Sequence, residues 1–152
     1  MASNTTFVSG AILTAQQQNN FPFGVMGYSK RTAGNVSVST TKADVTGASA
    51  TFTAIAGRAY KVTYSCTVTK NTTVGIFSFF IADGSNTDYY SLLADIRSTG
   101  SGDVVTFSNV VTGLSAGTQT LKIRASVNNN TGTINADATL PTSFIIEDIG
   151  IA

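Results

Sequence analysis

Two segments of the chain alternate between apolar and polar side chains at every second position, the period of a β-strand with one buried face. The apolar positions of residues 58–70 are Tyr60, Val62, Tyr64, Cys66 and Val68, and the residues between them are mainly Thr, Ser and Lys. Residues 119–128 repeat the pattern with Leu121, Ile123 and Val127. We predict that these eight side chains point into the core of an all-β domain.

Turn-forming residues divide the chain from Gly24 onward into short strands. Gly, Asn, Asp and Ser gather at the breaks, as they do in turns. The predicted strands are 24–30, 35–39, 50–55, 59–70, 74–82, 89–97, 103–111, 119–128, 133–138 and 143–149. Many short strands at this spacing indicate a sandwich or a barrel. We therefore predict one β-domain over residues 24–152.

The predicted strand 74–82 is apolar on both faces. Phe77, Phe79 and Ile81 share one face, while Ile76 and Phe80 share the other. A strand of this kind is normally covered on both sides. The outer cover is either the N-terminal segment of the same chain or a partner subunit. We predict a subunit interface at this strand, involving Ile76 and Phe80 or Phe77 and Phe79.

Residues 1–23 lack the strand alternation found in the rest of the chain. Thr14-Ala-Gln-Gln17 has the form of a capping box, and Asn19, Asn20 and Pro22 would end the helix after about two turns. The apolar residues that we expect to make contacts are Phe7, Ile12, Leu13, Phe21 and Phe23. This arm packs on its own domain or docks on a neighbour. We predict that residues 1–23 serve attachment rather than folding.

Charged residues make up only 11% of the chain, against about 25% in an average soluble protein. The net charge of +1 provides no basic footprint for nucleic acid or for an anionic membrane. No apolar run approaches the roughly 20 residues that span a bilayer, and no positive charge precedes Lys30 as in a secretory signal. We expect synthesis in a cytoplasm. So few charges favour an oligomer over a free monomer.

Reactive side chains are scarce, because the chain contains no histidine and a single cysteine. Cys66 lies on the apolar side of its predicted strand, where a thiol behaves as a small hydrophobic group. The loop from Asp83 to Asp88 gathers oxygen ligands suited to calcium, but it lacks the EF-hand pattern and is better explained as a solvated turn. Of the adjacent Tyr89 and Tyr90, one should enter the core. We predict a protein that is not an enzyme and that holds no metal or cofactor.

Three segments resemble structural proteins of tailed bacteriophages. Residues 10–24 resemble the "LTA…NN-x-P-x-G" head of those proteins, and residues 52–64 resemble their "FTA-x-AGR-x-Y-x-V" strand pair. Residues 142–150 are similar to their "F-x-x-EDIG" tail. The order and spacing of the three segments extend the resemblance over nearly the whole chain.

The resemblance implies an antiparallel β-sandwich of jelly-roll type, like the trimeric C1q and tumour necrosis factor domains, located in a virion and made in the host bacterial cytoplasm. It implies a homotrimer whose partners are the major capsid protein or other virion proteins, with no nucleic acid and no membrane. Fibre members follow a long shaft that these residues lack, so a capsid decoration (cement) protein is expected. The alternative is a tail protein that binds a host receptor or glycan through Asn86, Tyr89 and Asn128 to Asn130.

Overall fold

The computed structural model of the chain describes residues 18, 20–70, 75–97, 99–100 and 102–152, which contain ten β-strands and no named helix. The strands are β1 (Gly24–Arg31), β2 (Val36–Val38), β3 (Ala43–Ala54), β4 (Arg58–Lys70), β5 (Gly75–Asp83), β6 (Asp88–Ile96), β7 (Asp103–Val111), β8 (Gly117–Val127), β9 (Gly132–Asn135) and β10 (Thr142–Ile151). Each predicted strand corresponds to one of them. The capping box at Thr14 to Gln17 lies outside the described residues.

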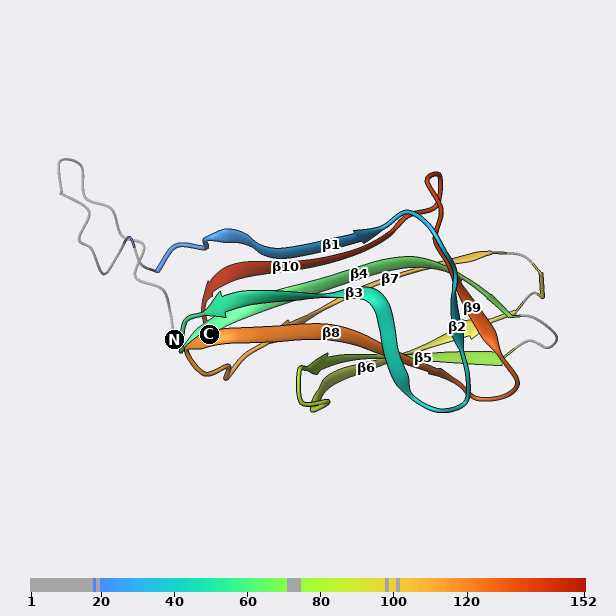
Figure 1. The fold of residues 1–152 in the computed structure, drawn as a ribbon. Coiled ribbons are helices and arrows are strands. Elements are labelled where there is room, and N and C mark those ends of the chain that lie inside the picture. The colour runs from blue at the N-terminus through green and yellow to red at the C-terminus, as the bar shows by residue number, and fades with distance from the viewer. Residues whose placement is uncertain (1–17, 19, 71–74, 98, 101) are drawn as a thin grey trace.

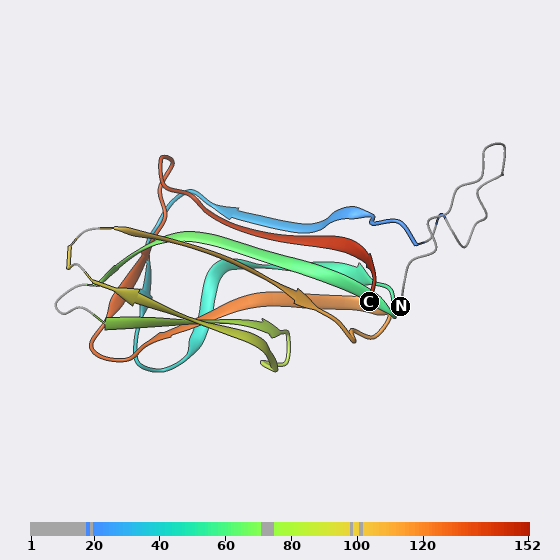
Figure 2. The ribbon, with the colours of Figure 1, turned by 180° about the vertical axis from the view of Figure 1, so that it is seen from behind.

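Two antiparallel sheets pack face to face as a sandwich (Figure 1, Figure 2). The six-stranded sheet has the order β1-β10-β4-β9-β2, and β7 pairs with β4 on its other edge. The four-stranded sheet has the order β3-β8-β5-β6. Strands that follow one another in sequence, such as β3 and β4 or β6 and β7, mostly lie in different sheets. This crossing pattern confirms the predicted all-β sandwich of jelly-roll type.

The core lies between the sheets and contains all eight side chains that the alternation selects. None of the eight is more than 3% exposed. Tyr64, Phe79 and Phe107 form an aromatic cluster with ring centroids 5.8–6.1 Å apart. Cys66 lies in this core, and its burial raises the pKa of the thiol to about 12. The thiol is therefore protonated at neutral pH, and Cys66 packs as a small hydrophobic side chain.

Strand β3 begins seven residues before the predicted start because a bulge breaks its alternation. Its pairing with β8 shifts register between Asp44 and Ser49, and Gly47 adopts a φ of +79° within the shift. The buried residues there are Val45 and Ala48, which are three positions apart instead of two. A two-residue period therefore misses this half of the strand.

The two ends of the sandwich are formed by different strand ends. β1 begins, β4 begins and β10 ends at one end, where the backbone N–H of Ala152 donates to Gly57 O at 2.9 Å (Figure 1). β4 and β8 both end at the opposite end, where Lys70 Nζ donates to Asn129 O at 2.6 Å. The N-terminal segment thus joins the domain at the end where β10 finishes.

Candidate functional site

Strand β5 presents two different faces to its surroundings. Phe77 and Phe79 are fully buried, with their rings stacked at 5.8 Å between centroids, so the placement of these two residues at a subunit interface is wrong. The pleat of the strand turns them toward the six-stranded sheet. Ile76 and Phe80 point outward and are only half-buried. They remain the proposed contact residues.

A lysine of the same domain provides part of the outer cover of β5. Lys42 Nζ lies 4.3 Å from the ring centroid of Phe80 and also pairs with Asp88. Arg124 stands beside Phe80 in the register of β8 and β5, and its Nε bonds Asp44 at 3.1 Å. An ammonium over an aromatic face is an attractive arrangement. The sequence prediction considered only the arm or a partner as cover, because nothing in the spacing of Lys42 and Phe80 indicates their contact.

The outer face of the six-stranded sheet also carries exposed apolar side chains. Registered neighbours share a face, so Tyr28, Ile145 and Thr63 form one row across β1, β10 and β4. Val104 and Val110 of β7 lie on the same face and are 72% and 46% exposed. Exposed apolar patches mark interaction surfaces. This second candidate surface was not predicted, because its residues belong to four separate strands.

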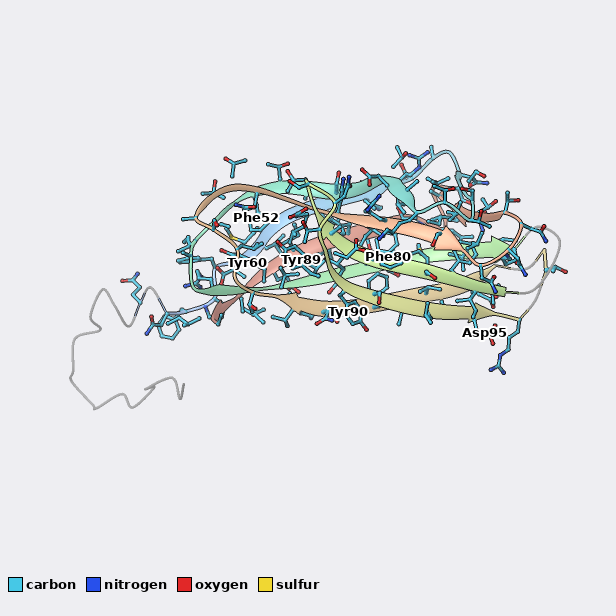
Figure 3. The ribbon with its side chains drawn as sticks, turned by 90° about the horizontal axis from the view of Figure 1, so that it is seen from below. Phe52, Tyr60, Phe80, Tyr89, Tyr90 and Asp95 are labelled. Atoms are coloured by element: carbon cyan, nitrogen blue, oxygen red, sulfur yellow. The ribbon has the colours of Figure 1, made fainter. Side chains whose placement is uncertain are left out.

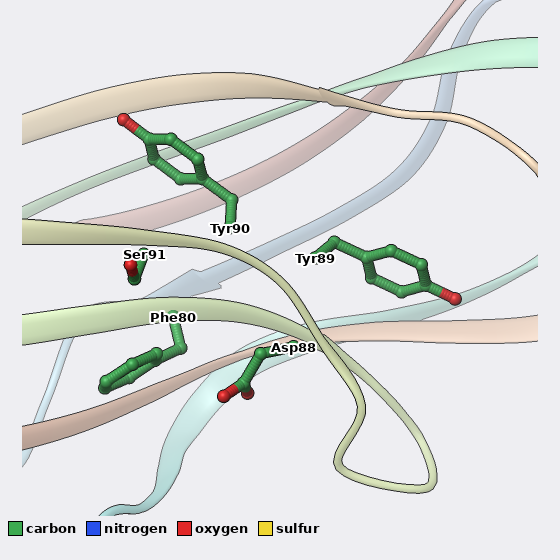
Figure 4. Close-up of a pocket in the computed structure, with 5 residues that line it drawn as sticks. All are labelled: Phe80, Asp88, Tyr89, Tyr90 and Ser91. Atoms are coloured by element: carbon green, nitrogen blue, oxygen red, sulfur yellow. The ribbon is translucent and has the colours of Figure 1, made fainter.

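A shallow groove of about 440 Å³ lies where β5 and β6 meet near their hairpin (Figure 3, Figure 4). Its lining residues are Phe80, Asp88, Tyr89, Tyr90 and Ser91. Tyr90 points to the opposite face of the sheet from Phe80 and Asp88. It packs against the core, as predicted for one of the two tyrosines. Tyr89 is 40% exposed, and burial raises its pKa, with a further contribution from Asp83. The groove therefore offers an aromatic ring, a hydroxyl and an ion pair to a ligand.

The loop from Asp83 to Asp88 uses its carboxylates in local bonds. Asp83 Oδ1 accepts hydrogen bonds from the backbone N–H groups of Ser85 and Thr87, both at 2.8 Å, and Asp88 pairs with Lys42. Within the described ranges, no group of three or more metal-ligating side chains could hold a metal ion. These contacts favour the solvated turn over the calcium loop.

The loops that would bind a glycan in the alternative function are not brought together. Asn128 Oδ1 accepts a hydrogen bond from Ile76 N–H at 3.0 Å, at the start of β5. Asn86 N–H donates to Asp83 O at 3.1 Å, at the other end of β5. At about 3.3 Å per residue, the strand from Gly75 to Asp83 separates the two places by roughly 26 Å. Asn128 to Asn130 and Tyr89 therefore do not form one site.

The predicted arm residues fall on both sides of the described boundary. Phe7, Ile12 and Leu13 lie outside the described residues, whereas Phe21 and Phe23 are 41% and 50% exposed at the start of the sandwich. The Arg58 guanidinium lies 4.2 Å from the ring centroid of Phe23 and donates to Phe21 O at 2.5 Å. The base of the arm thus contacts its own domain.

Arg58 forms a buried ion pair with Asp148 of β10. Burial raises the pKa of the Asp148 carboxyl, but the hydrogen bonds from Arg58 and from the backbone of Gly150, together with the charge of Arg58, bring it below its usual range. The sequence prediction did not single out these two residues as a pair. The available signal was that each is a charged residue of a quoted motif.

No protein-family model and no curated protein sequence matches the chain. Among solved structures, the fold is similar to Bacillus endospore appendages that form disulfide-linked pili (TM-score 0.41, 14% identity, 97% of this chain and 100% of that one). It is also similar to the tripod from the baseplate of bacteriophage Tuc2009 (0.47, 15%, 99% and 76%) and to the VP2 subviral particle of infectious bursal disease virus (0.35, 9%, 88% and 36%). Likenesses this distant say nothing about function. Over the residues that the structure describes, no helix is long and apolar enough to cross a membrane.

Proposed function

We propose that the protein is a structural component of a tailed-bacteriophage virion, and more specifically a capsid decoration (cement) protein that binds and stabilises the capsid exterior. The observation that carries the proposal is the meeting of three motif segments around one ion pair. The head supplies Phe21 and Phe23, the "AGR" segment supplies Arg58, and the "EDIG" segment supplies Asp148. Segments that resemble one class of virion protein are therefore parts of one structural unit.

The proposed mechanism is multivalent attachment by a homotrimer. Three N-terminal arms held by one trimer would engage the capsid lattice together, so that the combined affinity exceeds that of any one arm. Of the five predicted arm residues, Phe7, Ile12 and Leu13 are the proposed capsid contacts, because Phe21 and Phe23 contact Arg58 of their own domain. The proposed subunit contact is formed by Ile76 and Phe80. Scarce surface charge supports an assembled state, because such surfaces are poorly soluble alone.

A denaturing gel of purified virions tests the proposal through copy number. A capsid decoration protein is present in hundreds of copies, so its band should approach that of the major capsid protein. A band corresponding to a few copies or some tens of copies would place the protein in the tail and reject decoration. Its absence from virions would reject both.

The alternative function is a tail protein that binds a host receptor or glycan, and the groove beside Tyr89 favours it. An exposed aromatic ring next to hydroxyl and charged groups is suited to a sugar, whose ring has apolar faces and polar edges. The probe is the purified cell-wall polysaccharide of the host. Saturable binding that Tyr89→Ala abolishes would support this function, and no binding at millimolar sugar would reject it.

A further inference from the structure

The ion pair between Arg58 and Asp148 is buried at the end of the sandwich where β4 begins and β10 ends. The side chains of the two residues are 4% and 0% exposed. Two charges removed from water are stable only when their remaining hydrogen-bonding groups are also satisfied. Arg58 donates from Nε to Asp148 Oδ2 and from Nη2 to Oδ1, the latter at 2.6 Å. The backbone N–H of Gly150 adds a third bond to Oδ1 at 2.9 Å.

The N-terminal segment supplies further partners of this pair. Phe21 O accepts from Arg58 Nη2 at 2.5 Å, and the ring of Phe23 lies against the guanidinium. The backbone N–H of Phe23 also contributes to the lowered pKa of the Asp148 carboxyl. Both charges therefore interact with residues that precede the first strand.

Gly150 lies within contact distance of the same segment. The pairing of β10 with β4 shifts register between Asp148 and Gly150. Gly150 has a φ of +112°, which residues with a side chain rarely adopt. A Cβ atom at this position would meet Asn20 O at 3.4 Å. This is an ordinary contact distance, so the backbone of Asn20 lies beside Gly150, and the positive φ is the reason for glycine here.

We propose that Arg58, Asp148 and Gly150 form an intramolecular binding site for residues 20–24, and that this site fixes where the N-terminal segment leaves the sandwich. Its ligand is an extended peptide that offers one carbonyl to an arginine, one amide to a carboxylate and one aromatic ring to the guanidinium face. The inference is independent of the proposed function, since it concerns only the chain's own segment. It also makes Asn20 to Gly24 part of the domain.

Hydrogen exchange of full-length protein tests the site. The double variant Arg58→Met/Asp148→Leu replaces the pair with apolar side chains of similar size, an exchange that proteins often tolerate without loss of stability. Residues 20–24 should then exchange about tenfold faster, which corresponds to the loss of a hydrogen bond to a charged group. The strands β5 and β8 should keep their protection.

The matched control is the pair Lys61 and Glu147, which joins the same two strands on the outer face. Its charged atoms are 3.6 Å apart, and its side chains are 44% and 37% exposed. Lys61→Met/Glu147→Leu should leave the exchange of residues 20–24 unchanged.

Three results would overturn the proposal. Unchanged exchange of residues 20–24 in the Arg58/Asp148 variant would show that the segment does not depend on the pair. Equal loss of protection in residues 20–24, β5 and β8 would show that the pair braces the whole core. Should the double variant not fold, Phe23→Leu supplies the same readout, because it removes only the ring contact. Unchanged exchange in Phe23→Leu would also overturn the proposal.

Discussion

At the scale of the residue, Gly132 shows how a missing side chain can be part of the core. It lies in β9 opposite Lys70 and Val38, and a Cβ at this position would overlap the ring of Phe77. The φ of Gly132 is not in the left-handed region, so the need for glycine here is one of space. Phe77 is itself fully buried and stacked on Phe79, which leaves its ring little room to move.

We therefore expect Gly132→Ala to destabilise the protein by about 1–3 kcal/mol, as overpacked core positions do. Thermal unfolding followed by circular dichroism measures the loss as a lowered Tm. Gly84→Ala is the matched control, because its Cβ would meet only Thr120 Cβ at an ordinary 3.6 Å. Equal Tm values for the two variants would mean that the Phe77 ring can move aside at little cost.

Asp148 should link stability to acid pH. Its pKa is lower in the folded chain than the usual value of about 3.9. A carboxyl with a lowered folded pKa contributes stability above its unfolded pKa, and this contribution is lost as the pH falls through the folded pKa. We expect the free energy of unfolding to fall below about pH 4 in the native protein, and to fall less steeply in Asp148→Asn. Denaturant titrations at pH 7 and pH 3 measure the free energy of unfolding of the native protein and of the variant. An equal loss of this free energy in both proteins would exclude Asp148 as the cause.

At the scale of the element, the strands could be predicted because a buried face imposes a period of two. β4 and β8 obey this period over most of their length, and the eight inward residues that it predicts are buried, although Arg58, Lys70 and Ala125 were not among them. The start of β3 could not be predicted, because the bulge at Gly47 changes the spacing of the buried residues Val45 and Ala48. The cover over Phe80 was missed for a different reason. Lys42 reaches Phe80 only through the fold, which the local pattern does not contain.

The two outer sheet faces can be distinguished by one substitution on each. Phe80 of β5 and Ile145 of β10 are both half-buried, outward-facing and within a strand. The proposed interface predicts that Phe80→Asp turns a homotrimer into a monomer and that Ile145→Asp leaves the trimer intact. Multi-angle light scattering at micromolar concentration measures the mass, and circular dichroism verifies the fold. The reverse result would move the interface to the six-stranded sheet, and a native monomer would reject the trimer.

At the scale of the whole molecule, the sandwich has a terminal end and a loop end. Residues 20–24 and Ala152 lie at the first, where Arg58 and Gly57 bond them. Lys70, at the end of β4, and the turn at Asn129 lie at the second. The N-terminal segment and the turn at Asn129 therefore lie at opposite ends of the sandwich.

The contacts of Phe21 and Phe23 shift the proposed boundary of the attachment arm. The sequence indicated a break at Gly24, so that removing residues 1–23 would change the thermal stability by no more than a few degrees. Deleting residues 1–23 should instead destabilise the protein, because it removes hydrogen-bonding partners of the buried Arg58 and Asp148. We propose that the segment that serves attachment ends before Asn20.

Two truncations separate attachment from folding. Deleting residues 2–17 should leave the Tm nearly unchanged, whereas deleting residues 2–23 should cost about 1–3 kcal/mol, the penalty for a buried group that loses its partner. Both truncated proteins should fail to bind virions that lack the native protein, since both lack Phe7, Ile12 and Leu13. Co-sedimentation with such virions measures binding, and thermal unfolding measures stability. If the shorter deletion unfolds the protein, residues 2–17 belong to the core. If it folds and still binds, attachment lies elsewhere on the sandwich.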